Sequence, residues 1–215
     1  MTTLTAGYKR YFTDRRFLAS SFVAFLMLFA SLVINFYAGI YATEKASGAV
    51  TDIILSNTRV FDVDGIFIYG PVALSVLLAF MLLHKPHRIP FMLKSIGLFI
   101  TIRAVFISLT HIGPFPTHIM IPPSNFITDF TPGGDLFFSG HVGLPFLLAL
   151  IFWDEPFLRI LFIACSLVFG AIVLMAHLHY SIDVLSAFFI TYSIYRLAQI
   201  FFKKDGRLFA AGLED

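Results

Sequence analysis

The chain has 215 residues, of which 58% are hydrophobic and only 13% carry a formal charge, with a net charge of +2. A soluble domain is typically about 25% charged, and a core of this size cannot hide so much apolar surface from water. The composition therefore excludes an ordinary soluble protein and favours a single domain, residues 1–215, embedded in a lipid bilayer. The sequence has no basic stripe and no nucleic-acid module, so no nucleic-acid partner is expected.

Six apolar segments meet the length that a helix needs to cross about 30 Å of hydrocarbon. They predict an all-α integral membrane protein with six transmembrane helices. The predicted spans are approximately residues 17–41, 66–83, 91–112, 136–153, 160–176 and 184–202. The first is too long for the core of a signal peptide and is predicted to be retained as a helix. The polar segment 203–215 is predicted to be a short tail.

Lys and Arg residues are distributed unevenly around these spans. Twelve lie at or near the two termini and the second and fourth connections, whereas the opposite side holds only Lys45 and Arg59. Because basic residues are retained on the cytoplasmic side, both termini are predicted to be cytoplasmic. The connections 42–65, 113–135 and 177–183 would then face the periplasm of a bacterial inner membrane, or the lumen of an organelle.

Ionisable side chains near the outer ends of the spans indicate a functional site, because a membrane makes them costly. If the sixth helix begins near Tyr180, His179 and Asp183 are one turn apart on the same face. Asp183 could accept a hydrogen bond from one ring nitrogen of His179 and leave the other nitrogen free to attack. His141, about one and a half turns into the fourth predicted span, supplies a second imidazole for proton transfer.

A second group of residues favours binding of a phosphate near the start of the fourth predicted span. Ser139 is predicted to cap this helix, Gly140 permits close approach of the backbone, and free N–H groups there favour an anion. Arg103, inside the third predicted span, could add a guanidinium to the same charge. Asp135 and Tyr180 complete the candidate binding residues.

The residues alone leave two other classes of function open. The histidines could sense protons in a transporter or a membrane scaffold, although the polar residues cluster at one face and the sequence has no internal repeat. A zinc site is the other alternative, because four residues of this region are ordinary zinc-ligand types. These are His141, His177, His179 and Asp183.

Two short strings in these regions resemble catalytic motifs of a known family. They are similar to the second and third motifs of the sphingomyelin synthase branch of the type 2 phosphatidic acid phosphatase (PAP2) superfamily. The strings are Phe138-Ser139-Gly140-His141 and His179-Tyr180-Ser181-Ile182-Asp183. Two further features are similar to the same branch. They are Gly134-Asp135, and Arg103 followed by Gly113-Pro114-Phe115-Pro116. The resemblance covers roughly residues 66–200 and includes the six-span topology.

The resemblance implies a His-His-Asp triad that uses neither a metal nor a cofactor. His179 would form a phosphohistidine intermediate, Asp183 would orient it, and His141 would protonate the leaving alkoxide. The phospho-head group of a phospholipid donor would then pass to a lipid alcohol such as ceramide or diacylglycerol. With water as the acceptor, the same triad would give a phospholipase C-like hydrolase or a lipid phosphate phosphatase.

Departures from the phosphatase branch favour a phosphodiester donor. That branch has Pro where this chain has Phe138, and a Ser-Arg pair where it has Ile172 and Val173. A phosphomonoester dianion calls for several cations, whereas Arg103 is the one buried basic residue expected here. A phosphodiester carries a single negative charge, which one guanidinium can balance.

Overall fold

The computed structural model describes residues 10–119 and 136–212, and all regular secondary structure in that part of the chain is helical. The long helices are α2 (Arg15–Glu44), α3 (Asp64–His84), α4 (Ile89–Leu109), α6 (Pro156–Met175) and α7 (Ser181–Phe201). The shorter ones are α5 (Gly140–Ile151), α8 (Lys203–Ala211) and two 3-10 turns, η1 (Leu55–Asn57) and η2 (Pro86–Arg88). The predicted all-α class is confirmed for the described residues.

Five of these helices are long and apolar enough to cross a membrane, namely α2, α3, α4 with the preceding η2, α6 and α7. They lie close to five of the six predicted spans. The fourth predicted span, 136–153, corresponds to α5, which has 12 residues and is about 18 Å long at 1.5 Å per residue. Within the described part of the chain, the protein is thus a multi-pass helical membrane protein with five full-length candidate spans and one short apolar helix.

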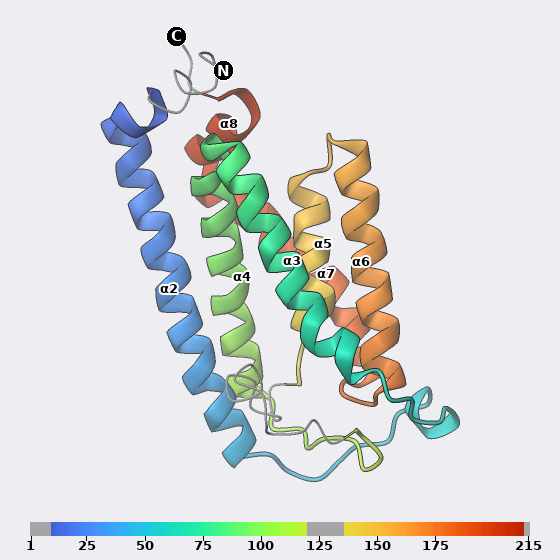
Figure 1. Ribbon diagram of the computed structural model, residues 1–215. Coiled ribbons are helices and arrows are strands. Elements are labelled where there is room, and N and C mark those ends of the chain that lie inside the picture. Colours follow the sequence, from blue (N-terminus) through green and yellow to red (C-terminus); the bar gives the residue numbers. More distant parts are fainter. Residues whose placement is uncertain (1–9, 120–135, 213–215) are drawn as a thin grey trace.

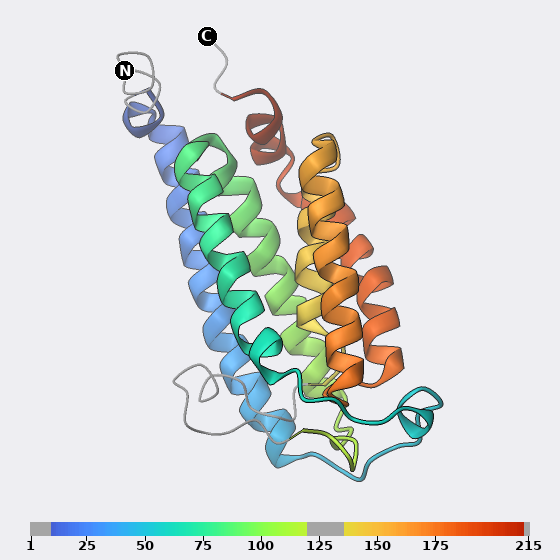
Figure 2. The same cartoon turned by 45° about the vertical axis from the view of Figure 1, so that its right-hand side comes forward.

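The sequence around α5 sets both of its ends. Ser139 is extended, so the helix begins only at Gly140. At the other end the chain turns after Phe152, and Pro156 starts α6 at a position where the missing N–H of proline costs nothing. Most side chains of α5 are buried, because α4, α6 and α7 pack around it. The Gly140 end of α5 therefore lies inside the helix bundle (Figures 1 and 2).

Helix α4 lies between two groups of helices, with α2 on one side and α5 and α7 on the other. Phe99 of α4 and Val142 of α5 belong to the central apolar cluster. The outward faces of the long helices carry exposed phenylalanines, such as Phe22, Phe80 and Phe189, which are about 70% exposed. An aqueous surface would not tolerate such faces, whereas contact with lipid chains suits them.

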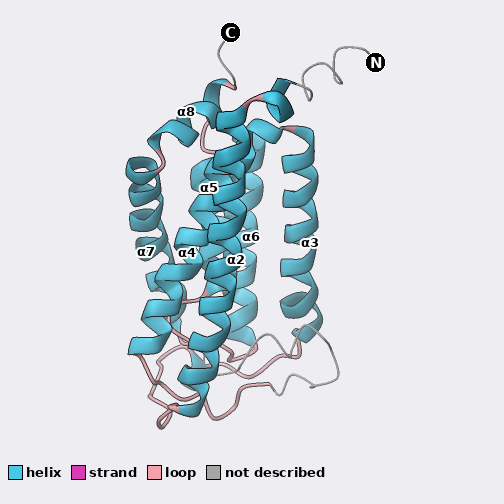
Figure 3. Cartoon of the chain, turned by 90° about the vertical axis from the view of Figure 1, so that its left-hand side faces the viewer, coloured by secondary structure: helices cyan, strands magenta, loops and turns pink. Residues whose placement is uncertain are grey.

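The segment after α7 is a helix, not the polar tail that was predicted. Helix α8 lies at the end of the bundle where α2 starts, away from the Gly140 end of α5 (Figure 3). Lys94 Nζ donates to Asp205 Oδ2 of α8 and to Ser20 Oγ of α2, both at 2.7 Å. One turn further along α8, Phe209 packs against Phe91. These contacts tie α2, α4 and α8 together, while the assignment of this end to the cytoplasm remains a prediction from the charge distribution.

Candidate active site

The predicted His179–Asp183 pair meets at the start of α7. Both side chains are buried, and His179 Nδ1 lies 3.6 Å from Asp183 Oδ2. This distance exceeds the range of an N–H···O hydrogen bond. The same carboxylate oxygen instead accepts the backbone N–H of Tyr180 at 2.9 Å and so caps the helix. The structure brings the two predicted residues together, but without the predicted hydrogen bond.

Three buried polar atoms at this place have no hydrogen-bond partner among the described residues. They are His179 Nδ1, Asp183 Oδ1 and Ser139 Oγ. The backbone N–H of Ser139 donates to the carbonyl of Asp183 at 3.2 Å, so the starts of α5 and α7 adjoin. Buried polar groups in proteins are nearly always paired, since an unpaired one costs about 1–3 kcal/mol. Such a group of atoms is typical of a site that binds a polar ligand.

The Ser139-Gly140-His141 string lies at the first turn of α5. Ser139 occupies the predicted capping position, but its hydroxyl makes no capping bond. A side chain at Gly140 would place its Cβ 3.2 Å from Arg103 Nε, so Arg103 packs against this position. His141 is the second residue of the helix, so its predicted position one and a half turns inside was wrong. The error arose because the helix starts at Gly140 and not at residue 136.

Arg103 reaches from α4 toward the start of α5. Its Nε donates to the carbonyl of Phe138 at 2.9 Å, and Nη1 donates to Asn35 Oδ1 of α2 at 3.4 Å. His141 lines the same cavity as Arg103 and Asn35. Sequence reasoning missed Asn35. An amide in the middle of an otherwise apolar span was the signal that could have identified it.

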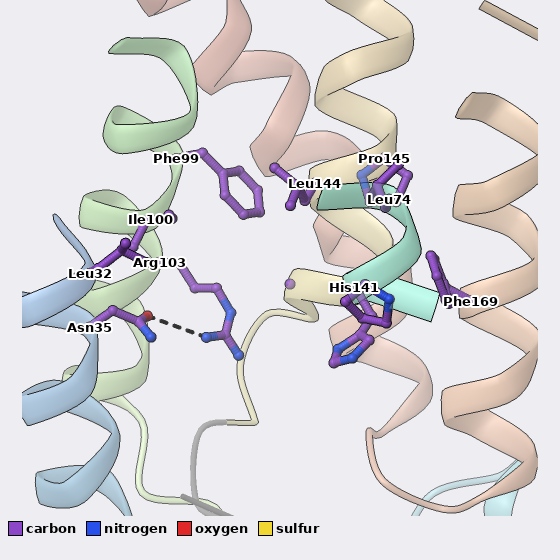
Figure 4. Close-up of a pocket in the computed structure, with 12 residues that line it drawn as sticks. Leu32, Asn35, Leu74, Phe99, Ile100, Arg103, His141, Leu144, Pro145 and Phe169 are labelled. Carbon is purple, nitrogen blue, oxygen red and sulfur yellow. Dashed lines mark hydrogen bonds between the residues drawn. The ribbon is translucent and has the colours of Figure 1, made fainter. Parts of the chain in front are cut away.

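A cavity of about 220 Å³ is lined by Arg103, Asn35 and His141 together with apolar side chains (Figure 4). His179, Asp183 and Ser139 do not line it. Arg103 and Asn35 lie on one side of it, and His141 and Phe169 lie on the other. The side chain of His141 stacks on Phe67, with 4.2 Å between ring centroids. Apart from its three polar side chains the cavity is lined by Leu32, Pro71, Leu74, Phe99, Ile100, Gly140, Leu144, Pro145 and Phe169. A polar end and an apolar wall therefore meet in one space.

Tyr180, like Ser139, lies outside the cavity. It is almost fully buried, its hydroxyl donates to the carbonyl of Gly113 at 2.7 Å, and it accepts the N–H of Val50 at 3.2 Å. Burial raises the pKa of this phenol. Tyr180 therefore joins two connections to the start of α7.

Asp52 is a residue of this region that sequence reasoning missed. Its Oδ2 accepts both the N–H and the hydroxyl of Ser181 at 2.7 Å, and its Oδ1 accepts the N–H groups of Ile54 and Leu55. Burial alone would raise the pKa of Asp52, but these hydrogen bonds outweigh it and hold the pKa below its ordinary value. An isolated acidic residue in the connection 42–65 was the only signal. Asp52 fixes that connection to the first residue of α7.

His177 is engaged away from the His179–Asp183 pair. Its Nδ1 lies 2.7 Å from Thr117 Oγ1, its Nε2 lies 3.3 Å from Thr58 Oγ1, and burial lowers its pKa. No group of three or more His, Cys, Asp or Glu side chains in residues 10–119 and 136–212 is arranged to hold a metal. Asp135, the remaining candidate, lies outside the described residues.

Comparison with known proteins supports one family. Residues 133–200 match the family model described as PAP2 superfamily C-terminal, and this segment contains both the Ser139-Gly140-His141 string and the His179–Asp183 pair. Neither the curated proteins nor the solved structures give a significant match. The match covers about a third of the chain and supports a relationship of this segment to the PAP2 superfamily, whose members are lipid phosphatases and phosphotransferases.

Proposed function

We propose that the protein transfers a phospho-head group from a phosphodiester lipid to a lipid alcohol such as ceramide or diacylglycerol, as the sphingomyelin synthase branch does. The observation that carries this proposal is the cavity in which Arg103 and His141 meet an apolar wall. A guanidinium suits a phosphate, and the apolar wall suits the hydrocarbon next to it. A small soluble phosphate ester would leave that wall without a partner.

In the first half of the proposed reaction, His179 Nε2 attacks the phosphorus of the donor. The Asp183 carboxylate faces Nδ1, at 3.6 Å, and favours the tautomer whose Nε2 carries the lone pair. The bond from phosphorus to the diacylglycerol oxygen breaks, and His141 donates its proton to that oxygen. The products are diacylglycerol and a phosphohistidine that still carries the head group.

In the second half, His141 is the base. It takes the proton from the hydroxyl of the acceptor, whose oxygen attacks the phosphorus and releases His179. Arg103 stabilises the negative charge on the phosphoryl oxygens in both halves. Arg103 is the one formally charged side chain among the described residues that line this cavity, which supports a singly charged diester over a phosphomonoester dianion.

A product assay tests the proposal. The purified protein is incubated with phosphatidylcholine, phosphatidylethanolamine or phosphatidic acid labelled in both the acyl chains and the phosphate, with and without ceramide or added diacylglycerol, and all labelled products are separated and identified. We expect a head-group-bearing product that depends on the added alcohol. Release of diacylglycerol without an acceptor would identify a phospholipase C-like hydrolase, and free phosphate from phosphatidic acid as the main product would overturn the diester proposal.

His179→Ala tests the proposed nucleophile, and His84→Ala is its matched control. His84 is exposed at the end of α3, far from α7 in the chain, and stacks only on Phe80 among the ring contacts described. We expect His179→Ala to abolish turnover and His84→Ala to retain it. Full lipid turnover by His179→Ala would contradict the proposed triad. Absence of turnover in the unmodified protein would instead favour a non-enzymatic function, such as a transporter or scaffold.

A further inference from the structure

A second cavity, of about 530 Å³, lies between α8 and the Ile151 end of α5, away from the Gly140 end of α5 at the candidate active site. Residues of α7 and α8, of the turn between α5 and α6, of the last position of α5, of the turn before α4 and of the first turn of α4 surround it. Its lining differs from that of the first cavity, because it contains three basic and two acidic side chains. These are Arg88, Lys203, Arg207, Asp154 and Glu155. The proposed reaction uses none of them.

Arg88 is the buried basic side chain of this cavity. It is only 8% exposed, its Nη2 donates to Glu155 Oε1, and its guanidinium carbon lies 5.2 Å from the ring of Phe152 and 5.1 Å from that of Phe209. Its Nε is buried and has no hydrogen-bond partner among the described residues. A buried cation is thus fixed between two rings with one donor unused, although its desolvation makes an unpaired donor costly.

The mouth of the cavity is basic. Lys203 and Arg207 are both exposed and lie four residues apart, on one face of α8. Glu155 is already paired with Arg88, so Asp154 is the one carboxylate that opposes the two exposed cations. Tyr195 and Gln199, which hydrogen-bond to each other at 2.9 Å, add neutral polar groups to the wall. The charge balance favours an anion.

The position of the cavity indicates where the anion comes from. Helix α8 follows directly on the membrane-spanning α7, and the last turn of α7 exposes Ile200 and Phe201. Basic residues that directly follow a transmembrane helix attract anionic lipid head groups, at about 1 kcal/mol per residue. We propose that this cavity binds the phosphate of an anionic phospholipid in the leaflet at the α8 end, with Lys203 and Arg207 at its mouth and Arg88 Nε within.

Trp153, the single tryptophan of the chain, provides a built-in reporter. It lies next to Phe152 and Asp154 of the cavity wall and is about half exposed. Phosphatidylglycerol with brominated acyl chains, which quench tryptophan on contact, is titrated against brominated phosphatidylcholine in vesicles that contain the full-length protein. Quenching gives the binding constant of the anionic lipid relative to the zwitterionic one. We expect preferential quenching by the anionic lipid.

Charge variants locate the binding. Lys203→Gln and Arg207→Gln should each lower the relative binding constant about fivefold, the equivalent of about 1 kcal/mol. Lys204→Gln is the matched control, because Lys204 is equally exposed but lines a neighbouring cavity instead of this one. Arg88 is left intact, since removing a buried, paired cation would unfold this end of the protein.

A neutral variant separates a true cavity from diffuse attraction. Ala210 lines the cavity and carries no charge, so Ala210→Trp fills space without changing the electrostatics. Because its new indole would add to the fluorescence signal, binding in this variant and in the unmodified protein is measured by native mass spectrometry of co-purified lipid. We expect loss of bound phosphatidylglycerol. Unchanged binding in Ala210→Trp, an equal loss in Lys204→Gln, or full competition by soluble glycerol phosphate would each overturn the proposal.

Discussion

The carboxylate of Asp183 faces the imidazole of His179 at 3.6 Å while it holds the backbone N–H of Tyr180 at 2.9 Å. The Asp183 side chain therefore both caps α7 and faces the catalytic candidate His179. Its second oxygen, Oδ1, is buried and has no hydrogen-bond partner within the described residues. A capping role and an orienting role can be separated experimentally, because only the second needs the negative charge.

Asp183→Asn should separate these roles. The amide oxygen of Asn can still accept the Tyr180 N–H, so we expect a similar melting temperature. Lipid turnover should fall by about 10²- to 10⁴-fold, because a neutral amide cannot stabilise the charge that His179 gains during attack. Lipid product formation and thermal unfolding are measured together. Asp62→Asn, an exposed carboxylate before α3, should change neither; full activity in Asp183→Asn would contradict the orienting role.

Asn35→Leu should weaken the reaction through Arg103. Asn35 Oδ1 accepts from Arg103 Nη1 at 3.4 Å, and loss of a hydrogen bond to a charged group costs about 1.5–3 kcal/mol. We expect kcat/KM to fall about tenfold, measured with a phosphodiester lipid in mixed micelles. Asn57→Leu, at an exposed 3-10 turn, is the control and should retain activity. If kcat/KM of Asn35→Leu equals that of the unmodified protein, Asn35 does not position Arg103.

Asp52 should make the free energy of unfolding decrease as the pH falls into the acid range. Hydrogen bonds hold its folded pKa below the ordinary value of 3.8, so the unfolded chain binds the proton more readily. Its contribution is therefore present at neutral pH and is lost as the pH falls through the depressed pKa. The stability difference between the unmodified protein and Asp52→Asn should be constant near neutrality and should shrink below about pH 4. Unfolding midpoints across this range measure it, and a difference that grows on acidification would contradict the sign.

Lys94 and Asp205 form a buried pair that joins α4 to α8, with side chains only 10% and 13% exposed. Lys94→Met leaves the Asp205 carboxylate without its cation and should cost about 3–5 kcal/mol of stability, measured by denaturant unfolding in micelles. Lys94→Met combined with Asp205→Leu should recover most of this loss, because an apolar pair replaces the ionic one. Lys204→Met, at an exposed position of α8, should be nearly neutral. An equal loss in the single and double variants would show that the pair itself is not the cause.

The pattern of apolar segments was sufficient to predict the long helices, because a bilayer requires a continuous apolar run whatever its neighbours are. It was not sufficient for α5. Residues 136–139 are apolar enough to extend that helix, but the contact between Ser139 N–H and the Asp183 carbonyl holds them outside it. That contact joins residues far apart in sequence, so no local pattern reports it. Helix α8 was missed for the same reason, since its packing partners lie on α4 and α2.

The candidate site was predictable where residue type carries the chemistry, as for His179 and Asp183. Roles that depend on where a side chain points in the folded protein could not be predicted from the sequence. Tyr180 belongs to the same string, yet its hydroxyl turns toward Gly113 and Val50. Asn35 comes from α2, for which the sequence offers no motif, and only the packing of α2 on α4 brings it to Arg103.

The short length of α5 has a consequence for how the protein is made. A 12-residue apolar helix is below the length at which a segment enters a bilayer by itself. We expect α5 to insert together with α6, as a helical hairpin closed by the turn at Pro156. Its final place then depends on α4 and α7, where Gly143 leaves no room for a side chain between Phe99 and Thr191. Substitutions at that crossing should therefore appear as failures of assembly during biogenesis, with intact chemistry in the molecules that escape degradation.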